Sequence, residues 1–165
     1  MKVELIDLKE DDFETVKEIY DYYVLNSTAT FHTERVSVSE LKEKILVGHP
    51  KYKSYLIKCN GVVSGYCYIS QYNRRQAYDR TAEISLYLKS ASRGKGIGRQ
   101  AIHQLEGIAI DLGIVVILGI ISGDNSQSIR LFEGCGYEKC GHLKELGVKF
   151  GRIIDVLIYQ KIFVS

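Results

Sequence analysis

The order of the predicted elements indicates an α+β fold of about seven strands and about four helices. Read along the chain, the elements follow the order β-α-α-β-β-β-α-β-α-β-β. Several strands follow one another without an intervening helix, which is typical of antiparallel pairing. A loop with three glycines also joins one strand directly to a helix. No repeat or linker interrupts this order, so residues 1–165 are expected to form a single domain.

The first half of the chain alternates clear strand and helix signals. Period-two alternation marks the strands, and Asp or Ser residues that can cap a helix precede the helical periodicity. Glycine follows the second helix, and Asn-Gly predicts a tight hairpin. The expected elements are a strand from Lys2 to Leu8, a helix from Asp11 or Asp12 to about Leu25, a helix from Ser37 or Ser39 to Val47 closed by Gly48, and strands Tyr52–Lys58 and Val62–Gln71 around Asn60-Gly61.

The second half contains the glycine loop and the remaining elements. Apolar residues on both faces of one strand predict a central place in the sheet. The three strands before the loop are expected to form an antiparallel meander. The expected elements are a strand Thr81–Leu88, a helix from Ile97 to Leu112 closed by Gly113, a central strand Ile114–Ile121, a helix Asn125–Glu133 closed by Gly134, and strands Tyr137–Leu146 and Arg152–Ile162.

Composition excludes several classes of function. The net charge of +2, from 22 basic and 20 acidic residues, gives no global case for nucleic acid binding. We see neither a signal peptide nor a membrane span, so a cytoplasmic protein is expected. The four cysteines have apolar neighbours and are expected to be small buried side chains rather than disulfide partners. The scattered histidines predict no metal site.

The glycine loop carries the strongest chemical signal. Its glycines leave the backbone without side chains, and its basic residues add positive charge at a helix N-terminus. The sequence of the loop is Arg93-Gly94-Lys95-Gly96-Ile97-Gly98-Arg99. Backbone N–H groups there can converge on a pyrophosphate. Neither the P-loop pattern nor the dinucleotide fingerprint fits the glycine spacing. On pattern alone, the loop predicts a phosphate-bearing ligand, and a flexible loop is the alternative.

The loop resembles the Gln/Arg-x-x-Gly-x-Gly/Ala motif of the GCN5-related N-acetyltransferase (GNAT) superfamily. Three further blocks extend this resemblance, and they are most similar to the phosphinothricin and methionine sulfoximine acetyltransferase branch. They are residues 19–20 with 27–31, residues 72–83, and residues 147–152 with 155–156. The resemblance implies a mixed, mostly antiparallel sheet whose central strands splay apart to admit acetyl-CoA. It also implies a homodimer.

The resemblance assigns the cosubstrate site residue by residue. The main chain of Leu86, Tyr87 and Leu88 is expected to bind the pantetheine arm of acetyl-CoA, and residues 94–99 are expected to bind its pyrophosphate. Asn125 resembles the asparagine with which the family contacts the cofactor, and Ser128 is a second polar contact. Asn125 is also well suited simply to cap a helix, whatever the function.

Glu83 is the predicted general base. Acetyl transfer needs a neutral amine, and Glu83 is the only acid in the strand leading to the glycine loop. Alternation puts it on one strand face with Ser85 and Tyr87. Without the resemblance, a surface carboxylate on an edge strand would explain it equally well. Many relatives carry a tyrosine or histidine where this chain has Phe132, so no general acid is assigned, although Tyr137 is a neighbouring alternative.

The acceptor is predicted to be a small amino acid. Arg74 and Arg75 resemble the substrate loop of the branch, and an arginine fork suits a carboxylate. Phe31 and Tyr78 are expected to line the side-chain pocket, and Lys149 is expected to reach a site, one that the branch places across a dimer interface. By resemblance the acceptor is phosphinothricin, methionine sulfoximine or methionine sulfone. The alternatives are a peptide N-terminus, a polyamine or another amine, or a non-catalytic CoA-binding sensor.

Overall fold

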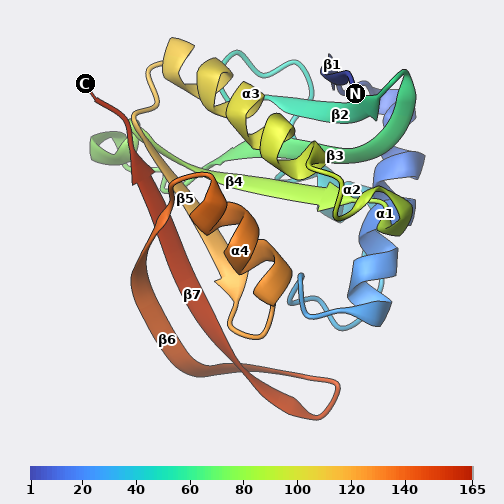
Figure 1. The fold of residues 1–165 in the computed structure, drawn as a ribbon, viewed down its shortest axis with the longest axis vertical. Coiled ribbons are helices and arrows are strands. Elements are labelled where there is room, and N and C mark those ends of the chain that lie inside the picture. The colour runs from blue at the N-terminus through green and yellow to red at the C-terminus, as the bar shows by residue number, and fades with distance from the viewer. Residues whose placement is uncertain (165) are drawn as a thin grey trace.

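The computed structural model describes residues 1–164 and contains a seven-stranded sheet in the order β1-β2-β3-β4-β5-β7-β6 (Figure 1). The strands are β1 (Val3–Asp7), β2 (Ser54–Cys59), β3 (Val62–Gln71), β4 (Thr81–Leu88), β5 (Val116–Ser122), β6 (Glu138–Lys149) and β7 (Arg152–Ile162). The helices are α1 (Phe13–Asn26), α2 (Val38–Lys42), α3 (Ile97–Asp111) and α4 (Ser126–Gly134). This confirms the predicted element order.

All neighbouring strands pair antiparallel except β4 and β5, which pair parallel over three residues. The sheet is therefore mixed and mostly antiparallel, as the resemblance implied. β5 lies between β4 and β7, which confirms the central place that its two apolar faces predicted.

Two hydrophobic cores lie on opposite faces of the sheet. One core joins the sheet to α3 and α4, with Leu105 and Phe132 among its buried side chains. The other joins it to α1 and α2, with Phe13 and Leu41 buried. Figure 1 shows α3 and α4 crossing the near face of the sheet, where they cover its central strands. Of the helices within residues 1–164, none is long and apolar enough to cross a membrane.

The second helix is shorter than predicted. Ser37 caps α2 as expected, because its side chain accepts a hydrogen bond from Glu40 N at 3.2 Å. The helix ends at Lys42 rather than Val47, since the chain tightens into a turn in which Lys44 N donates to Leu41 O at 3.3 Å. This turn brings the side chain of Lys44 toward the sheet.

Two tight turns explain the hairpins of the fold. Asn60 and Gly61 both have positive φ, of 51° and 80°, as the predicted Asn-Gly turn requires. Phe150 and Gly151 make a second turn of this kind, with φ of 53° and 70°, between β6 and β7. The β6–β7 hairpin extends beyond the end of β5 and forms the lower end of the molecule in Figure 1.

One expectation about the cysteines is wrong. Cys67 and Cys135 are buried and Cys59 is partly buried, but Cys140 is exposed. Cys140 lies at an irregularity of the β6–β7 ladder, where the register shifts between Lys139 and Gly141. The irregularity turns its side chain out of the regular alternation.

Candidate active site

The central feature of the site is a fork between β4 and β5. The two strands pair only at Thr81↔Val116, Ala82↔Ile117 and Glu83↔Leu118. Beyond Glu83, β4 remains paired with β3 as far as Leu88, while β5 remains paired with β7. The side of β4 that faces β5 therefore offers main-chain groups of residues 86–88 to a ligand, as an unpaired strand edge does.

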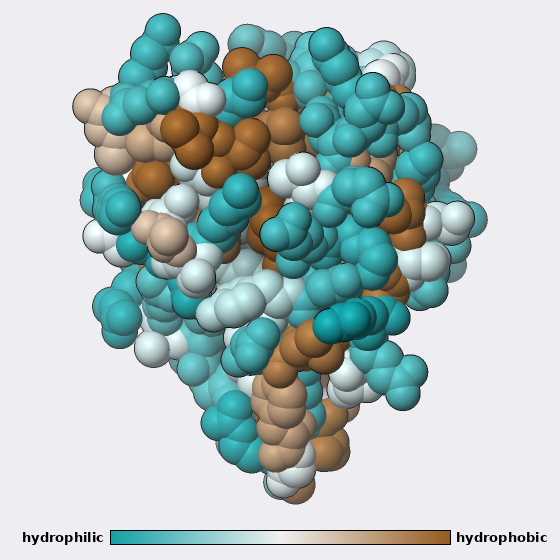
Figure 2. All heavy atoms as spheres, turned by 90° about the vertical axis from the view of Figure 1, so that its right-hand side faces the viewer, coloured by the Kyte–Doolittle hydropathy of each residue, from teal (hydrophilic) through white to brown (hydrophobic). Residues whose placement is uncertain are grey.

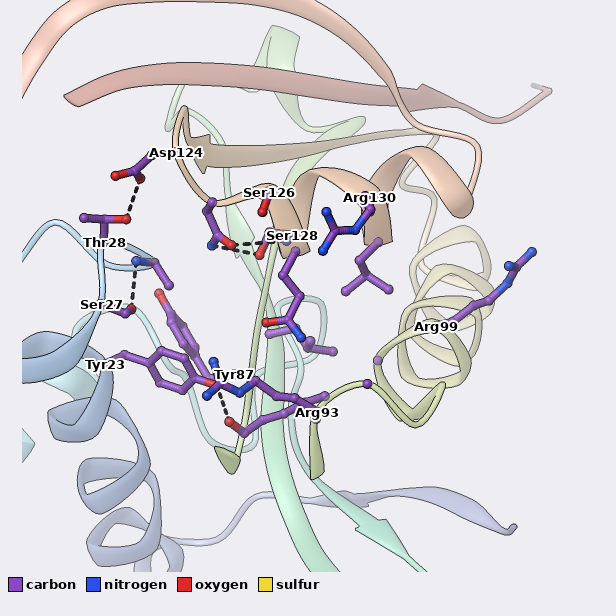
Figure 3. Close-up of a pocket in the computed structure, with 18 of the residues that line it drawn as sticks. Tyr23, Ser27, Thr28, Tyr87, Arg93, Arg99, Asp124, Ser126, Ser128 and Arg130 are labelled. Atoms are coloured by element: carbon purple, nitrogen blue, oxygen red, sulfur yellow. Dashed lines mark hydrogen bonds between the residues drawn. The ribbon is translucent and has the colours of Figure 1, made fainter. Parts of the chain in front are cut away.

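A cavity of about 590 Å³ opens at this fork, and we call it the donor cavity (Figure 3). Its size falls within the usual range for small-molecule sites. The end of β4, the glycine loop, the start of α4 and residues 27–29 form its walls. Its lining includes Leu86, Tyr87, Leu88, Arg93, Gly94, Gly96, Gly98, Arg99, Asn125 and Ser128.

The glycine loop has the geometry of an anion site. Gly94 and Gly96 have positive φ, of 72° and 81°, a conformation that costs a residue with a Cβ about 1–2 kcal/mol. Gly96 is the N-cap of α3, whose first N–H groups have no partner within the helix. A Cβ on Gly98 would lie 3.2 Å from Leu131 Cδ2, so glycine there permits close packing of α3 on α4.

Arginines supply the positive charge of the donor cavity. Arg93, Arg99, Arg130 and Arg152 line it, from the loop, α3, α4 and the start of β7. The Arg93 guanidinium lies 5.8 Å from the Tyr23 ring centre, which orients it across the cavity. Figure 3 shows Arg99 projecting outward from α3 and Arg130 lying along α4. Lys95 is exposed and Ile97 is buried, and neither lines the cavity.

Asn125 is the N-cap of α4, and it also faces the donor cavity. Its Oδ1 accepts a hydrogen bond from Ser128 N at 3.2 Å, and its Nδ2 donates to Ser128 Oγ at 3.0 Å. Capping and cosubstrate contact are therefore compatible for this residue. The two side chains form a polar edge beside the fork.

Asp124 joins three segments at the rim of the donor cavity. Its Oδ1 accepts hydrogen bonds from Thr28 Oγ1 at 2.5 Å and from Ser122 Oγ at 2.7 Å, and its Oδ2 lies 3.4 Å from Arg152 Nη2. Burial opposes ionisation, but these hydrogen bonds and Arg152 outweigh it, and the pKa of Asp124 is lowered. The carboxylate thus fixes residues 27–29 against the turn before α4.

A second cavity of about 300 Å³ lies on the other side of Tyr87, and we call it the acceptor cavity. Ala29 and Tyr87 line both cavities. Glu83 lines the acceptor cavity and not the donor cavity, and Lys44 Nζ lies 3.4 Å from its Oε2. Phe31, predicted to contact the acceptor, lines the same cavity.

Three tyrosines line the acceptor cavity, and one of them, Tyr87, also lines the donor cavity. Burial raises the pKa of Tyr20, Tyr68 and Tyr87, so their hydroxyl groups are neutral donors near pH 7. The Tyr20 hydroxyl is hydrogen-bonded to Thr30 and also to His32 Nδ1, which orders the segment over the cavity. The wall is aromatic and carries few charges.

Four predicted substrate residues lie outside the acceptor cavity. Arg74, Arg75 and Tyr78 belong to the exposed connection between β3 and β4. Lys149 is 3% exposed, and its Nζ donates to Thr30 O at 2.9 Å. Burial lowers the pKa of Lys149. Lys149 therefore supports the wall of the cavity from behind. That any of these four residues contacts the substrate remains a prediction.

Phe132 packs in the core rather than on the donor cavity. Its ring meets Tyr137 edge-on, with centroids 4.9 Å apart, and lies over Gly119, where a Cβ would be 2.6 Å from its ring. The Tyr137 hydroxyl is buried, and its pKa is raised by burial and by Glu106. Neither residue lines either cavity, so the structure brings neither to the place of a proton donor.

The structure also reveals site residues that sequence reasoning missed. Tyr20, Thr28 and Arg152 lie in segments that carry the family resemblance, but no site role was predicted for them, and the fold brings the missed residues to the cavities. In the donor cavity they are Tyr23, Thr28, Asp124, Arg130 and Arg152, and in the acceptor cavity Tyr20, His32, Lys44 and Tyr68.

Comparison with known proteins agrees with this geometry. A family model described as an acetyltransferase (GNAT) domain matches residues 5–158. The L-methionine sulfoximine/L-methionine sulfone acetyltransferase of Salmonella typhimurium is 31% identical over 153 residues, covering 90% of this chain and 88% of that protein. The phosphinothricin N-acetyltransferase of Alcaligenes faecalis is 30% identical over 93% of this chain and 79% of that protein.

A solved structure extends the similarity to the fold. The phosphinothricin acetyltransferase of Sinorhizobium meliloti, in complex with AcCoA, superposes with a TM-score of 0.90 at 32% identity, covering 99% of this chain and 89% of that one. The chain thus belongs to the GNAT acetyltransferases. Within them, it is an N-acetyltransferase of the branch that contains the phosphinothricin and methionine sulfoximine acetyltransferases.

Proposed function

We propose that this protein transfers the acetyl group of acetyl-CoA to the amino group of a small amino acid such as methionine sulfone, methionine sulfoximine or phosphinothricin. The observation that carries the proposal is the fork after Glu83, with a donor cavity on one side of Tyr87 and an acceptor cavity on the other. Two substrates bound in these cavities would approach each other from opposite sides of Tyr87, which suits direct transfer in a ternary complex.

The donor cavity fits acetyl-CoA. The open edge of β4 at Leu86, Tyr87 and Leu88 matches the amides of the pantetheine arm. The N-terminus of α3 with Gly94, Gly96 and Gly98 suits the pyrophosphate, and Arg93, Arg99 and Arg130 are available for its negative charge. Asn125 and Ser128 supply a polar edge. Similar proteins support the proposal, since the Sinorhizobium meliloti structure is in complex with AcCoA.

Glu83 acts as the general base in this proposal. As the amine nitrogen bonds to the thioester carbonyl carbon, its proton passes to Glu83, directly or through water. The bond between that carbon and sulfur breaks, and the thiolate leaves. A thiol pKa of about 8.5 allows it to leave without a dedicated acid, and water then returns a proton. This accounts for the absence of a donor at Phe132.

The acceptor assignment draws on the second cavity. About 300 Å³ suits a small molecule rather than a folded protein surface. Phe31, Tyr20 and Tyr68 offer apolar ring surface and neutral hydroxyls to a side chain such as a sulfone. The amino acids named for the similar Salmonella typhimurium and Alcaligenes faecalis enzymes are acceptors of this size.

We also propose a homodimer, formed through the β6–β7 hairpin. Val148 and Ile153 are cross-strand partners and are 66% and 65% exposed. Leu146, two residues from Val148, is 58% exposed. Figure 2 shows hydrophobic side chains gathered on the narrow lower end of the molecule, where this hairpin lies. Such a patch is typical of an interface.

The experiment that tests the function is thiol release from acetyl-CoA across a panel of amines. The proposal expects release with methionine sulfone, methionine sulfoximine or phosphinothricin and little release with spermidine or peptides. Tight binding of CoA without release on any amine would instead support a sensor domain.

A further inference from the structure

Lys44 is a charged residue that lines the acceptor cavity. It lies in the turn after α2, and its side chain reaches the carboxylate of Glu83, with 3.4 Å between Nζ and Oε2. Among the described residues that line this cavity, Glu83 is the one carboxylate and Lys44 the one lysine or arginine. His32 is the remaining titratable ring, and the tyrosines are neutral.

The ion pair between Lys44 and Glu83 is easily exchanged. The Lys44 side chain is 58% exposed, whereas that of Glu83 is 19% exposed. A pair with one partner so exposed contributes about 0–1 kcal/mol to stability. A second anion entering the cavity can therefore take the ammonium group from Glu83 at little cost in free energy.

An α-amino acid carries the charges that fit this pair. Its amino nitrogen and carboxylate oxygens are about 2.7–3.6 Å apart, as standard bond lengths and angles dictate. Nζ and Oε2 are separated by a similar distance, 3.4 Å. An acceptor whose amine faces Glu83 thus brings its carboxylate within reach of Lys44.

We propose that Lys44 binds the acceptor's carboxylate and in doing so releases Glu83 to receive the proton of the amine. The inference rests on the proposed function and names the residue that selects amino acids over other amines. It also predicts that a polyamine is disfavoured, since a second positive charge would face Lys44 instead of a carboxylate.

Lys44 and the Arg74-Arg75 pair are alternative binding groups for the carboxylate of the acceptor. The sequence assigned carboxylate recognition to the arginines, which lie in the exposed β3–β4 connection and outside the cavity. Lys44 lines the cavity itself. Replacing each cation in turn therefore identifies which one binds the carboxylate.

The test compares two acceptors that differ only in the carboxylate: methionine sulfone and its decarboxylated amine, 3-(methylsulfonyl)propylamine. Lys44→Met keeps an unbranched side chain, one atom shorter, and removes the charge. We expect its KM for methionine sulfone to rise about tenfold or more, as loss of a hydrogen bond to a charged group predicts, with a much smaller change for the decarboxylated amine. Lys44→Arg should restore most of the lost affinity.

Lys42→Met is the matched control. Lys42 lies two residues earlier, pairs with Glu10 and does not line the acceptor cavity, so its replacement should leave both KM values unchanged. Thermal unfolding of each variant checks that it folds.

Three results would overturn the inference alone. They are an unchanged KM in Lys44→Met, an equal rise for both acceptors, and a carboxylate-specific rise in Arg74→Met or Arg75→Met instead. Failure of the wild-type protein to acetylate any amino acid is a separate outcome, because it overturns the proposed function and this inference with it.

Discussion

Glu83 and Leu118 are the last paired residues of the two parallel central strands, and the sheet opens immediately beyond them. The predicted base thus stands where the fork begins. The open edge of β4 continues from Glu83 into the donor cavity, while the Glu83 carboxylate faces the acceptor cavity. The pair of Glu83 and Leu118 therefore marks both the point where the sheet opens and the position of the proposed base.

Replacement of Glu83 by Gln should reduce turnover without reducing affinity for acetyl-CoA. Loss of a positioned base lowers the rate by about 100-fold or more. The loss should be greatest at low pH, where little of the acceptor amine is neutral. Steady-state kinetics across pH and calorimetric titration with acetyl-CoA measure the two effects. Unchanged turnover over that pH range would rule out the assignment.

Replacement of Gly96 by Ala should weaken acetyl-CoA binding specifically. Gly96 has a φ of 81°, so a Cβ strains the loop by about 1–2 kcal/mol and displaces the N–H groups at the start of α3. Gly113 is a matched control, because its φ is 85°, a Cβ there meets nothing within 4 Å, and it lies at the far end of α3.

Both glycine variants should lose similar stability in urea unfolding, but only Gly96→Ala should raise the Kd for acetyl-CoA, by about tenfold. Equal affinity in the two variants would mean that the loop does not hold the cosubstrate.

Replacement of Asp124 by Asn should cost stability in a pH-dependent way. The pKa of Asp124 is lower in the folded protein than in the unfolded chain, so the carboxylate stabilises the fold above a pH of about 4. This contribution is lost as the pH falls through the lowered pKa. With screening at the rim, we expect a difference of about 1 kcal/mol at pH 7.

Urea unfolding of both proteins from pH 7 down to acid should therefore show two curves that converge. A constant difference would indicate a packing effect rather than the charge of Asp124.

Replacement of Val148 and Ile153 by Asp should convert the proposed homodimer to a monomer. Two carboxylates on one exposed face would repel those of the other copy and remove apolar contact. Light scattering coupled to size exclusion measures the mass. Val62→Asp is the control, because Val62 is equally exposed, at 67%, but lies on the β2–β3 hairpin. A monomeric wild-type protein would refute this interface.

The sequence predicts well those features that depend on neighbouring residues. The glycine loop, the Asn60-Gly61 turn and the strand that contains Glu83 all have short signals, and the structure has each of them where it was expected. The end of α2 was predicted too late, because a turn bond to Leu41 replaces the last helical turn.

Features that depend on distant residues were missed. Lys44, His32 and Tyr20 reach the acceptor cavity from separate segments, and no spacing along the chain relates them to Glu83. The burial of Lys149 depends on the carbonyl of Thr30, which lies 119 residues earlier. Charge and family position indicated that Lys149 matters, but they could not distinguish support of the cavity wall from contact with substrate.

The most direct test of the central claim is a competition assay. Acetyl-CoA is supplied in limiting amount with equal concentrations of methionine sulfone and spermidine, and mass spectrometry identifies the acetylated product. Because Lys44 lies beside Glu83 in the acceptor cavity, we expect N-acetyl-methionine sulfone as the main product. N-acetylspermidine as the main product, or intact acetyl-CoA with neither product, would contradict it.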